Sequence, residues 1–236
     1  MLNTLFLTPT LTHNVAVEFK NSIIETDRLL ARHGIRAGYM DIGGDPYLAK
    51  VRNHLATRVL DEFPTVENIF WVDDDVGWPA EAAMRFIHRP EMVVAGVYPK
   101  KQATLDFPVT LLQDKDTGKL IESNGLYAAS MVPTGFLRWK RPVLELMAQQ
   151  RPRYIDMIKG EWREFAEVFR TGVLFEDRKW YGEDPAFCEE WTRLGGEIWV
   201  DPNIPFTHRG GNKWSATLAD HLAKFKHNDG DQNGEH

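Results

Sequence analysis

Three consecutive aspartates, Asp73 to Asp75, directly follow the apolar run 68–72. Neighbouring carboxylates ~4 Å apart repel each other by about 1–4 kcal/mol for an effective dielectric between 80 and 20, so three of them at the end of a buried strand need a cation. In an open α/β sheet, ligands bind at this end of the strands. Carboxylate oxygens suit Mg²⁺ or Mn²⁺, and such an ion can hold a diphosphate. The alternative is a solvated turn in which one aspartate caps the helix that Pro79 begins.

Two further pairs of polar residues could take part in binding or catalysis. Arg52 and Asn53 lie on the polar side of a predicted helix, where a guanidinium can bind phosphate and an amide can bond a ribose or sugar hydroxyl. Taken alone, the pair is explained more simply as a solvated helix face. Glu183 and Asp184 stand at a loop-to-helix junction before Pro185. Asp184 can cap that helix or act as a general base, a role worth about 10²–10⁴ in rate.

His208 and Arg209 precede a pair of glycines near the end of the chain. An imidazole and a guanidinium in this position could face a metal-bound diphosphate. A single histidine after a strand is more often structural, and that interpretation stays open here.

The elements that must position these residues alternate along the first hundred residues. Strands are expected at 2–7, 35–40, 68–72 and 92–97, and helices at 14–33, from Asp45-Pro46 to 59, and from Pro79. Thr8, Pro9 and Thr10 would form the loop after the first strand, and Asp41 would follow the second. Alternating strands and helices predict an α/β fold with a doubly wound, mostly parallel sheet.

The second half predicts a mixed arrangement. We expect a hairpin from 109–113 and 119–123, a strand at 131–139, a helix at 142–149, a helix from Asp184-Pro185 to Gly195-Gly196 and a strand at 198–200. The stretch 151–179 has no clear period, which is typical of a mobile or substrate-ordered region. Residues 227–236 are almost wholly polar and are predicted to be a disordered tail.

Composition excludes several classes of protein. The chain has 236 residues and a net charge of −6, which argues against general binding of nucleic acid. No stretch approaches the ~18–20 apolar residues of a membrane span. The single Cys188 cannot form an intramolecular disulfide. With no cationic leader at the start, we expect a cytoplasmic protein.

Taken together, the motifs resemble the metal-dependent, inverting glycosyltransferases of the GT-A fold, especially the large family-2-like group. The segments that carry the resemblance are Ala49-Lys-Val-Arg52-Asn53, Ile69-Phe-Trp-Val-Asp73-Asp-Asp75 with its Asp-x-Asp motif, Thr134-Gly135-Phe136 with Gly182-Glu183-Asp184, and His208. They occur in the expected order and span residues 2–212. The resemblance implies one catalytic domain over 1–226, with a nucleotide-binding half (1–100) and an acceptor-side half (101–226).

The resemblance also implies a UDP- or GDP-linked sugar as donor and a carbohydrate or other hydroxyl compound as acceptor. The residues expected to hold the donor are Thr8, Pro9, Thr10, Asp41, Arg52, Asn53, Asp73, Asp74, Gly135 and Arg209. Asp75 and His208, with Asp73, would bind Mn²⁺ or Mg²⁺. Asp184, or as second choice Glu183, would deprotonate the acceptor as it attacks the anomeric carbon.

The motif of processive synthases is absent, because the corresponding region reads Glu189-Glu190-Trp191-Thr192-Arg193, so transfer of a single sugar is expected. A sugar-nucleotide pyrophosphorylase is one rival, although the loop after the first strand lacks the glycines typical of that class. A metal phosphohydrolase and a non-catalytic carbohydrate-binding protein are the others. The transferase hypothesis requires Asp75 and His208 to lie within about 10 Å of each other beside a cleft, since they must share an ion with ~2 Å bonds.

Overall fold

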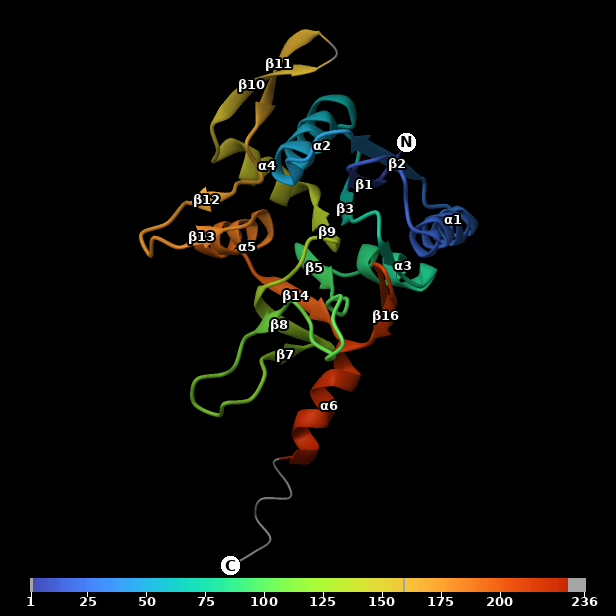
Figure 1. Ribbon diagram of the computed structural model, residues 1–236, viewed down its shortest axis with the longest axis vertical. Coiled ribbons are helices and arrows are strands. Elements are labelled where there is room, and N and C mark those ends of the chain that lie inside the picture. The colour runs from blue at the N-terminus through green and yellow to red at the C-terminus, as the bar shows by residue number, and fades with distance from the viewer. Residues whose placement is uncertain (1, 159, 229–236) are drawn as a thin grey trace, which may run out of the picture.

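A nine-stranded central sheet organises the part of the chain that the computed structural model describes, residues 2–158 and 160–228. Its strands are β1 (Thr4–Thr10), β2 (Ala37–Gly43), β3 (Asn68–Val72), β5 (Val93–Gly96), β6 (Thr110–Leu111), β7 (Glu122–Ser123), β8 (Leu126–Met131), β9 (Phe136–Lys140) and β14 (Ile198–Asp201). Their order is β2-β1-β3-β9-β5-β14-β8-β6, and β7 also pairs with β8 (Figure 1). All of these strands except β8 and β9 run in one direction.

The remaining elements are helices and small sheets. The helices are α1 (Val17–Arg32), α2 (Leu48–Glu62), α3 (Ala80–Ile87), α4 (Arg141–Gln149), α5 (Glu183–Arg193) and α6 (Leu218–Asn228). The small sheets are the hairpins β10 (Arg153–Ile158) with β11 (Glu161–Ala166) and β12 (Gly172–Val173) with β13 (Trp180–Tyr181), and the sheet of β4 (Val76–Gly77), β15 (Phe206–Arg209) and β16 (Lys213–Ala216). Among the described helices, none has both the length and the apolar character needed to cross a membrane.

Helices cover both faces of the central sheet. Because side chains alternate along a strand, Leu5 and Leu7 of β1 pack with α2, whereas Phe6 between them packs with α1 and its neighbour α3. This burial of the strands on both faces explains their continuous apolar runs. The three-layer arrangement confirms the α/β fold, the mostly parallel sheet and the mixed second half.

Strand β3 has the bounds that the sequence predicts, and all five of its residues are buried. Trp71 packs edge-on against Trp139 of β9 and against Phe169, at ring-centroid distances of 5.3 and 4.8 Å. This strand delivers the aspartate triplet to the edge of the sheet.

The first strand is longer than expected, since Thr8, Pro9 and Thr10 belong to β1 and Asp41 lies within β2. The pairing of β1 with β2 continues to Thr10 opposite Gly43, whereas its pairing with β3 ends at Leu7. Pro9 lies beyond the end of the pairing with β3, so the N–H that proline lacks is not needed for a hydrogen bond to that strand.

The second half differs from expectation in several places. The stretch 151–179, in which no regular element was expected, contains the β10–β11 hairpin. Tyr154 and Phe165 of this hairpin pack against His54 of α2, which holds the hairpin against the helix. The predicted 109–123 hairpin is only partly formed, since β6 and β7 both pair with β8. The predicted strand 131–139 is interrupted at 132–135. Helix α6 includes residues 227–228 of the predicted tail, and 229–236 lie outside the described residues.

Helix starts also shift. Asp45 precedes the N-cap of α2, which is Tyr47, and its carboxylate accepts a hydrogen bond from the Tyr47 backbone. Gly182 is the N-cap of α5, so Asp184 is in the first turn of the helix rather than at its cap.

Candidate functional site

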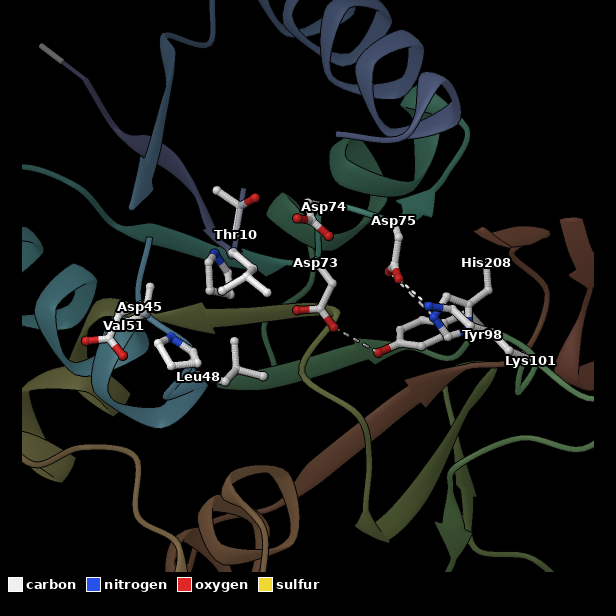
Figure 2. A pocket seen from close by; sticks show the side chains of 13 residues that line it. Thr10, Asp45, Leu48, Val51, Asp73, Asp74, Asp75, Tyr98, Lys101 and His208 are labelled. Carbon is white, nitrogen blue, oxygen red and sulfur yellow. Dashed lines mark hydrogen bonds and ion pairs between the residues drawn. The ribbon is translucent and has the colours of Figure 1, made fainter. Parts of the chain in front are cut away.

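A cleft of about 430 Å³ opens at the carboxyl ends of β1 and β3, beside the start of α2 (Figure 2). It is lined by Pro9, Thr10, Leu11, Asp45, Pro46, Leu48, Val51, Asp73, Asp74, Asp75, Tyr98, Lys101 and His208. All three aspartates of the triplet therefore face this cleft. Its volume is within the range of about 300–1,000 Å³ that is common for small-molecule sites.

Asp73 is held by two side chains. Arg52 Nη2 lies 2.7 Å from Asp73 Oδ1, and the Tyr98 hydroxyl donates to Asp73 Oδ2 at 3.4 Å. Arg52 is only 1% exposed and does not line the cleft. Although burial opposes its charge, the attraction of Asp73 and Asp184 outweighs burial and raises the pKa of Arg52. The structure thus makes Arg52 a buried support for Asp73, not the surface phosphate ligand expected from the sequence.

Asn53 is also buried, and its side-chain amide forms hydrogen bonds with the backbone of Phe169. Its Nδ2 donates to the Phe169 carbonyl at 2.9 Å, and its Oδ1 accepts the Phe169 N–H at 2.6 Å. The expected contact of Asn53 with a ribose or sugar hydroxyl does not fit this arrangement. Asn53 instead fixes the segment whose Phe169 ring lies beside the Arg52 guanidinium, 5.6 Å from its ring centre.

Asp75 and His208 meet although they are 133 positions apart in the sequence. His208 of β15 pairs with Val76 of β4, and the Arg209 N–H donates to the Asp75 carbonyl at 2.8 Å. This pairing brings His208 Nε2 to 3.5 Å from Asp75 Oδ1, well within the 10 Å that the transferase hypothesis requires. The cleft that the hypothesis also requires lies beside them.

The orientation of His208 is set by its other ring nitrogen. His208 Nδ1 lies 2.9 Å from the Pro99 carbonyl, and since a carbonyl can only accept, Nδ1 carries the proton. In the neutral ring, Nε2 is then a lone pair facing the Asp75 carboxylate, so two acceptors confront each other. A proton on Nε2, which would then donate to Asp75, or a metal ion bound by both groups would remove this conflict. A carbonyl that orients a histidine in this way is also typical of metal sites.

These residues fit a divalent ion only in part. Within the described part of the chain, no three His, Cys, Asp or Glu side chains are grouped closely enough to hold a metal ion. Mg²⁺ commonly takes one or two protein ligands and completes its shell with water and substrate phosphates. Asp75 and His208 would supply such a pair, while Asp73 is committed to Arg52 and Tyr98.

Sequence reasoning missed Tyr98 and Lys101. Lys101 forms an ion pair with Asp75, and the Tyr98 ring packs edge-on against His208 with 4.6 Å between ring centres. Burial would raise the pKa of Asp75, but the hydrogen bonds from His208 and Lys101 outweigh it and lower the pKa. Tyr98 directly follows the predicted strand 92–97 and Lys101 comes three residues later, so their position beyond a strand's carboxyl end was the available signal.

Asp184 is outside the lining of the cleft but is linked to Asp73 through the segment between β8 and β9. The Thr134 hydroxyl donates a hydrogen bond to Asp184 Oδ1, and the neighbouring Gly135 carbonyl accepts the Asp73 N–H at 3.1 Å. Burial raises the pKa of Asp184 to about 6, opposed by the positive charge of Arg52 and reinforced by the negative charge of Glu183. This pKa keeps Asp184 mainly ionised at neutral pH while making it a better base than an ordinary aspartate.

Gly135 is required by close packing. A Cβ at this position would meet the Tyr98 hydroxyl and would lie 2.5 Å from Asp73 Oδ2. The missing side chain of Gly135 therefore leaves room for the Tyr98 hydroxyl and the Asp73 carboxylate.

The expected base and ribose residues divide into two groups. Pro9 and Thr10 line the cleft, whereas Thr8 is fully buried, and Asp41 lies outside the lining and pairs with His13 at 3.1 Å. Asp45, which sequence reasoning assigned to a helix cap, lines the cleft instead.

The last two candidates from the sequence also differ in position. Asp74 lines the cleft, and burial raises its pKa. The exposed Arg209 lies outside the lining of the cleft, and its Nη1 is 3.8 Å from Glu18 Oε1. Its guanidinium is therefore not positioned for the expected contact with a diphosphate.

Neither a protein-family model nor a curated protein sequence matches the chain. Among solved structures, "A197 from STIV" is similar with a TM-score of 0.51 and 17% identity, over 92% of this chain and 91% of that one. At this identity the similarity concerns the fold alone.

Looser similarities involve two enzymes. A glycosyltransferase involved in glycosylation of the major capsid of PBCV-1 matches with a TM-score of 0.35 and 12% identity, over 61% of this chain and 63% of that one. The inositol-1-phosphate CTP transferase from T. maritima matches with a TM-score of 0.42 and 11% identity, over 89% and 90%. At these TM-scores we draw no argument from either match.

Proposed function

We propose that the protein is a metal-dependent glycosyltransferase that moves one sugar from a UDP- or GDP-sugar to an acceptor hydroxyl. The observation that carries this proposal is the meeting of Asp75 and His208, 3.5 Å apart, on a cleft large enough for a nucleotide sugar. Asp184, with its pKa raised to about 6, is linked to Asp73 through the neighbouring residues Thr134 and Gly135.

The cleft offers separate surfaces to the parts of a donor. Pro9, Thr10 and Asp45 line the region next to α2, where the nucleoside would bind. Asp73, held by Arg52 and Tyr98, presents a fixed carboxylate to a ribose or sugar hydroxyl. Such pre-organisation lowers the cost of ordering the site when the donor binds.

The leaving group of the proposed reaction is a nucleoside diphosphate, whose oxygen gains negative charge as the bond to the sugar breaks. Asp75 and His208 would hold Mn²⁺ or Mg²⁺, and this ion, when bound, would stabilise that charge as a Lewis acid. Arg52 contributes a fixed positive charge behind Asp73.

Asp184 serves as the general base in this proposal. Its carboxylate takes the proton from the acceptor hydroxyl, whose oxygen then forms the new bond to the anomeric carbon. Attack from the face opposite the leaving diphosphate inverts the configuration at that carbon. Glu183, the neighbouring carboxylate, raises the pKa of Asp184 by repulsion and is the second choice for the base.

The experiment is a screen of UDP- and GDP-sugars with the full chain and Mn²⁺. Isothermal titration measures binding, and chromatography measures whether nucleoside diphosphate is released from the donor. Asp75→Asn and His208→Ala should abolish the release, and Asp184→Asn should abolish transfer while retaining donor binding. Asp116→Asn, an exposed residue outside the site, is the matched control.

The rival functions give different products. A sugar-nucleotide pyrophosphorylase would form pyrophosphate from a nucleoside triphosphate and a sugar phosphate. A non-catalytic binding protein would bind the donor tightly without turnover, and Asp184→Asn would change nothing. Either result would contradict the glycosyltransferase proposal.

A further inference from the structure

The loop that follows β5 closes over the aspartate triplet. The Lys100 N–H donates to the Asp106 carbonyl at 2.8 Å, Lys100 Nζ pairs with Asp106 Oδ2 at 2.5 Å, and the Gln102 N–H donates to the Lys100 carbonyl at 2.9 Å. These contacts pin the base of the loop and thereby define the position of Lys101.

Lys101 extends from this loop to the place where the divalent ion would bind. Its ammonium pairs with Asp75 Oδ2, while the other carboxylate oxygen of Asp75 faces His208 Nε2 at 3.5 Å (Figure 2). The side chain of Lys101 also passes close to Gly210, where an added Cβ would lie 3.1 Å from Lys101 Cδ. Loop, glycine and carboxylate together make a built position for one ammonium group.

An ammonium and a divalent ion cannot share this carboxylate at low cost. Like charges repel at close range, and both cations would lie on the single carboxylate of Asp75, the ammonium on Oδ2 and the metal on Oδ1 beside His208. When no metal is present, Lys101 and Arg52 supply two positive charges against the three aspartates.

We propose that Lys101 is a tethered counter-ion that competes with the divalent cation for Asp75. The inference rests on the proposed function only in assuming that a divalent ion binds at this carboxylate. Lys101 thus weakens metal binding in the absence of a nucleotide and keeps the acidic triplet neutralised until the metal arrives.

The test measures free Mn²⁺ by electron paramagnetic resonance during titration of the full chain without any nucleotide. Lys101→Met should tighten Mn²⁺ binding by about tenfold or more, because one competing positive charge is removed. Lys115→Met is the matched control, since it removes the same charge from an exposed residue between β6 and β7, outside the lining of the cleft. Lys101→Arg, which keeps the charge, should bind Mn²⁺ as the unmodified chain does.

Repeating the titration in the Asp75→Asn variant tests whether Lys101 and Mn²⁺ compete at Asp75. With Asp75→Asn in place, Lys101→Met should no longer tighten Mn²⁺ binding. Circular dichroism establishes that each variant is folded. Unchanged or weaker Mn²⁺ binding by folded Lys101→Met, an equal gain in Lys115→Met, or no Mn²⁺ binding by either chain at millimolar concentration would overturn the proposal.

This assay contains no sugar nucleotide, so its outcome is independent of sugar transfer. If Lys101→Met tightens Mn²⁺ binding but no donor is turned over, the glycosyltransferase proposal fails and the role of Lys101 stands. If donors are turned over but Lys101→Met does not change Mn²⁺ binding, the glycosyltransferase proposal stands and the proposed role of Lys101 fails.

Discussion

The Thr134 hydroxyl donates a hydrogen bond to the Asp184 carboxylate, joining the segment between β8 and β9 to the first turn of α5 across 50 positions of sequence. The residue after Thr134, Gly135, accepts the Asp73 backbone N–H at 3.1 Å. A short chain of contacts therefore links the proposed general base to the aspartate that faces the donor. Changes along this chain should alter acid–base behaviour and donor binding in separable ways.

Asp184 should set the lower pH limit of activity. Since its pKa is about 6 and the base must be ionised, kcat/KM should fall about tenfold for each pH unit below 6. Asp184→Asn should reduce transfer by about 10²–10⁴ and leave the residual rate without this pH limb. A pH–rate profile checks both, and a variant that retains the limb would exclude Asp184 as the base.

Asp184→Asn should lower activity but raise the stability of the fold at high pH. A carboxyl whose pKa rises from 3.8 to about 6 on folding contributes stability below pH 4 that is lost as the pH rises through 6. The loss amounts to up to about 3 kcal/mol at 1.36 kcal/mol per pKa unit. Asp184→Asn should therefore increase the free energy of unfolding at pH 8, with little change at pH 4. Urea denaturation at both values measures the difference, and equal effects at the two pH values would contradict this origin.

Thr134→Val should shift the pH limb upward. The Thr134 hydroxyl stabilises the ionised form of Asp184 and holds its pKa down, although burial is the larger and opposing effect. Losing this hydrogen bond should move the midpoint of the pH–rate profile above 6. Thr134→Ser keeps a hydroxyl and should retain the original midpoint. A limb that stays in place in the valine variant would show that the hydrogen bond does not tune the base.

Gly135→Ala should impair donor binding. The added methyl group would meet the Tyr98 hydroxyl and Asp73 Oδ2, so one of them must move. Forced displacements of this kind typically cost about 1–3 kcal/mol in stability. Combining the substitution with Tyr98→Phe should recover part of this stability, since the nearest contact, the Tyr98 hydroxyl, disappears while those with Asp73 Oδ2 and the ring Cζ at 2.7 Å remain. Gly211→Ala, which meets no atom within 4 Å, is the control for thermal unfolding. Wild-type donor affinity in Gly135→Ala would contradict the proposed packing role.

Arg52 should act through Asp73. Because Arg52 Nη2 holds Asp73 Oδ1 at 2.7 Å, Arg52→Met should weaken donor binding by about 5- to 150-fold, the range expected for a lost hydrogen bond worth about 1–3 kcal/mol. In a double-mutant cycle, adding Arg52→Met to Asp73→Asn should cause little further loss. Fully additive losses, measured by isothermal titration, would instead favour direct contact of Arg52 with a phosphate.

The local features of this protein follow from its sequence. The apolar run 69–72 becomes part of the buried strand β3, whose bounds 68–72 are those predicted, because burial on both faces requires such a run. Alternating strands and helices predict the α/β fold, and the charged triplet after β3 marks the ligand-binding edge.

Contacts between distant segments were decided by the tertiary structure alone. Arg52 lies on a helix face that looks polar in sequence, yet it is buried because Asp73 and the Phe169 segment close over it. The position of Lys101 depends on a loop pinned by Lys100 and Asp106, and no hydrophobic period encodes that loop.

The sequence alone thus determined most elements of the first hundred residues, their order and the strand end at which the aspartate triplet lies, because hydrophobic period and charge act over a few neighbouring residues. Only the tertiary structure decided which of those ends meet. The pairing of β4 with β15 joins Asp75 to His208, and the turn after β8 joins Thr134 to Asp184. Such pairings depend on how the whole sheet and its helices pack, and no local stretch of sequence contains that information.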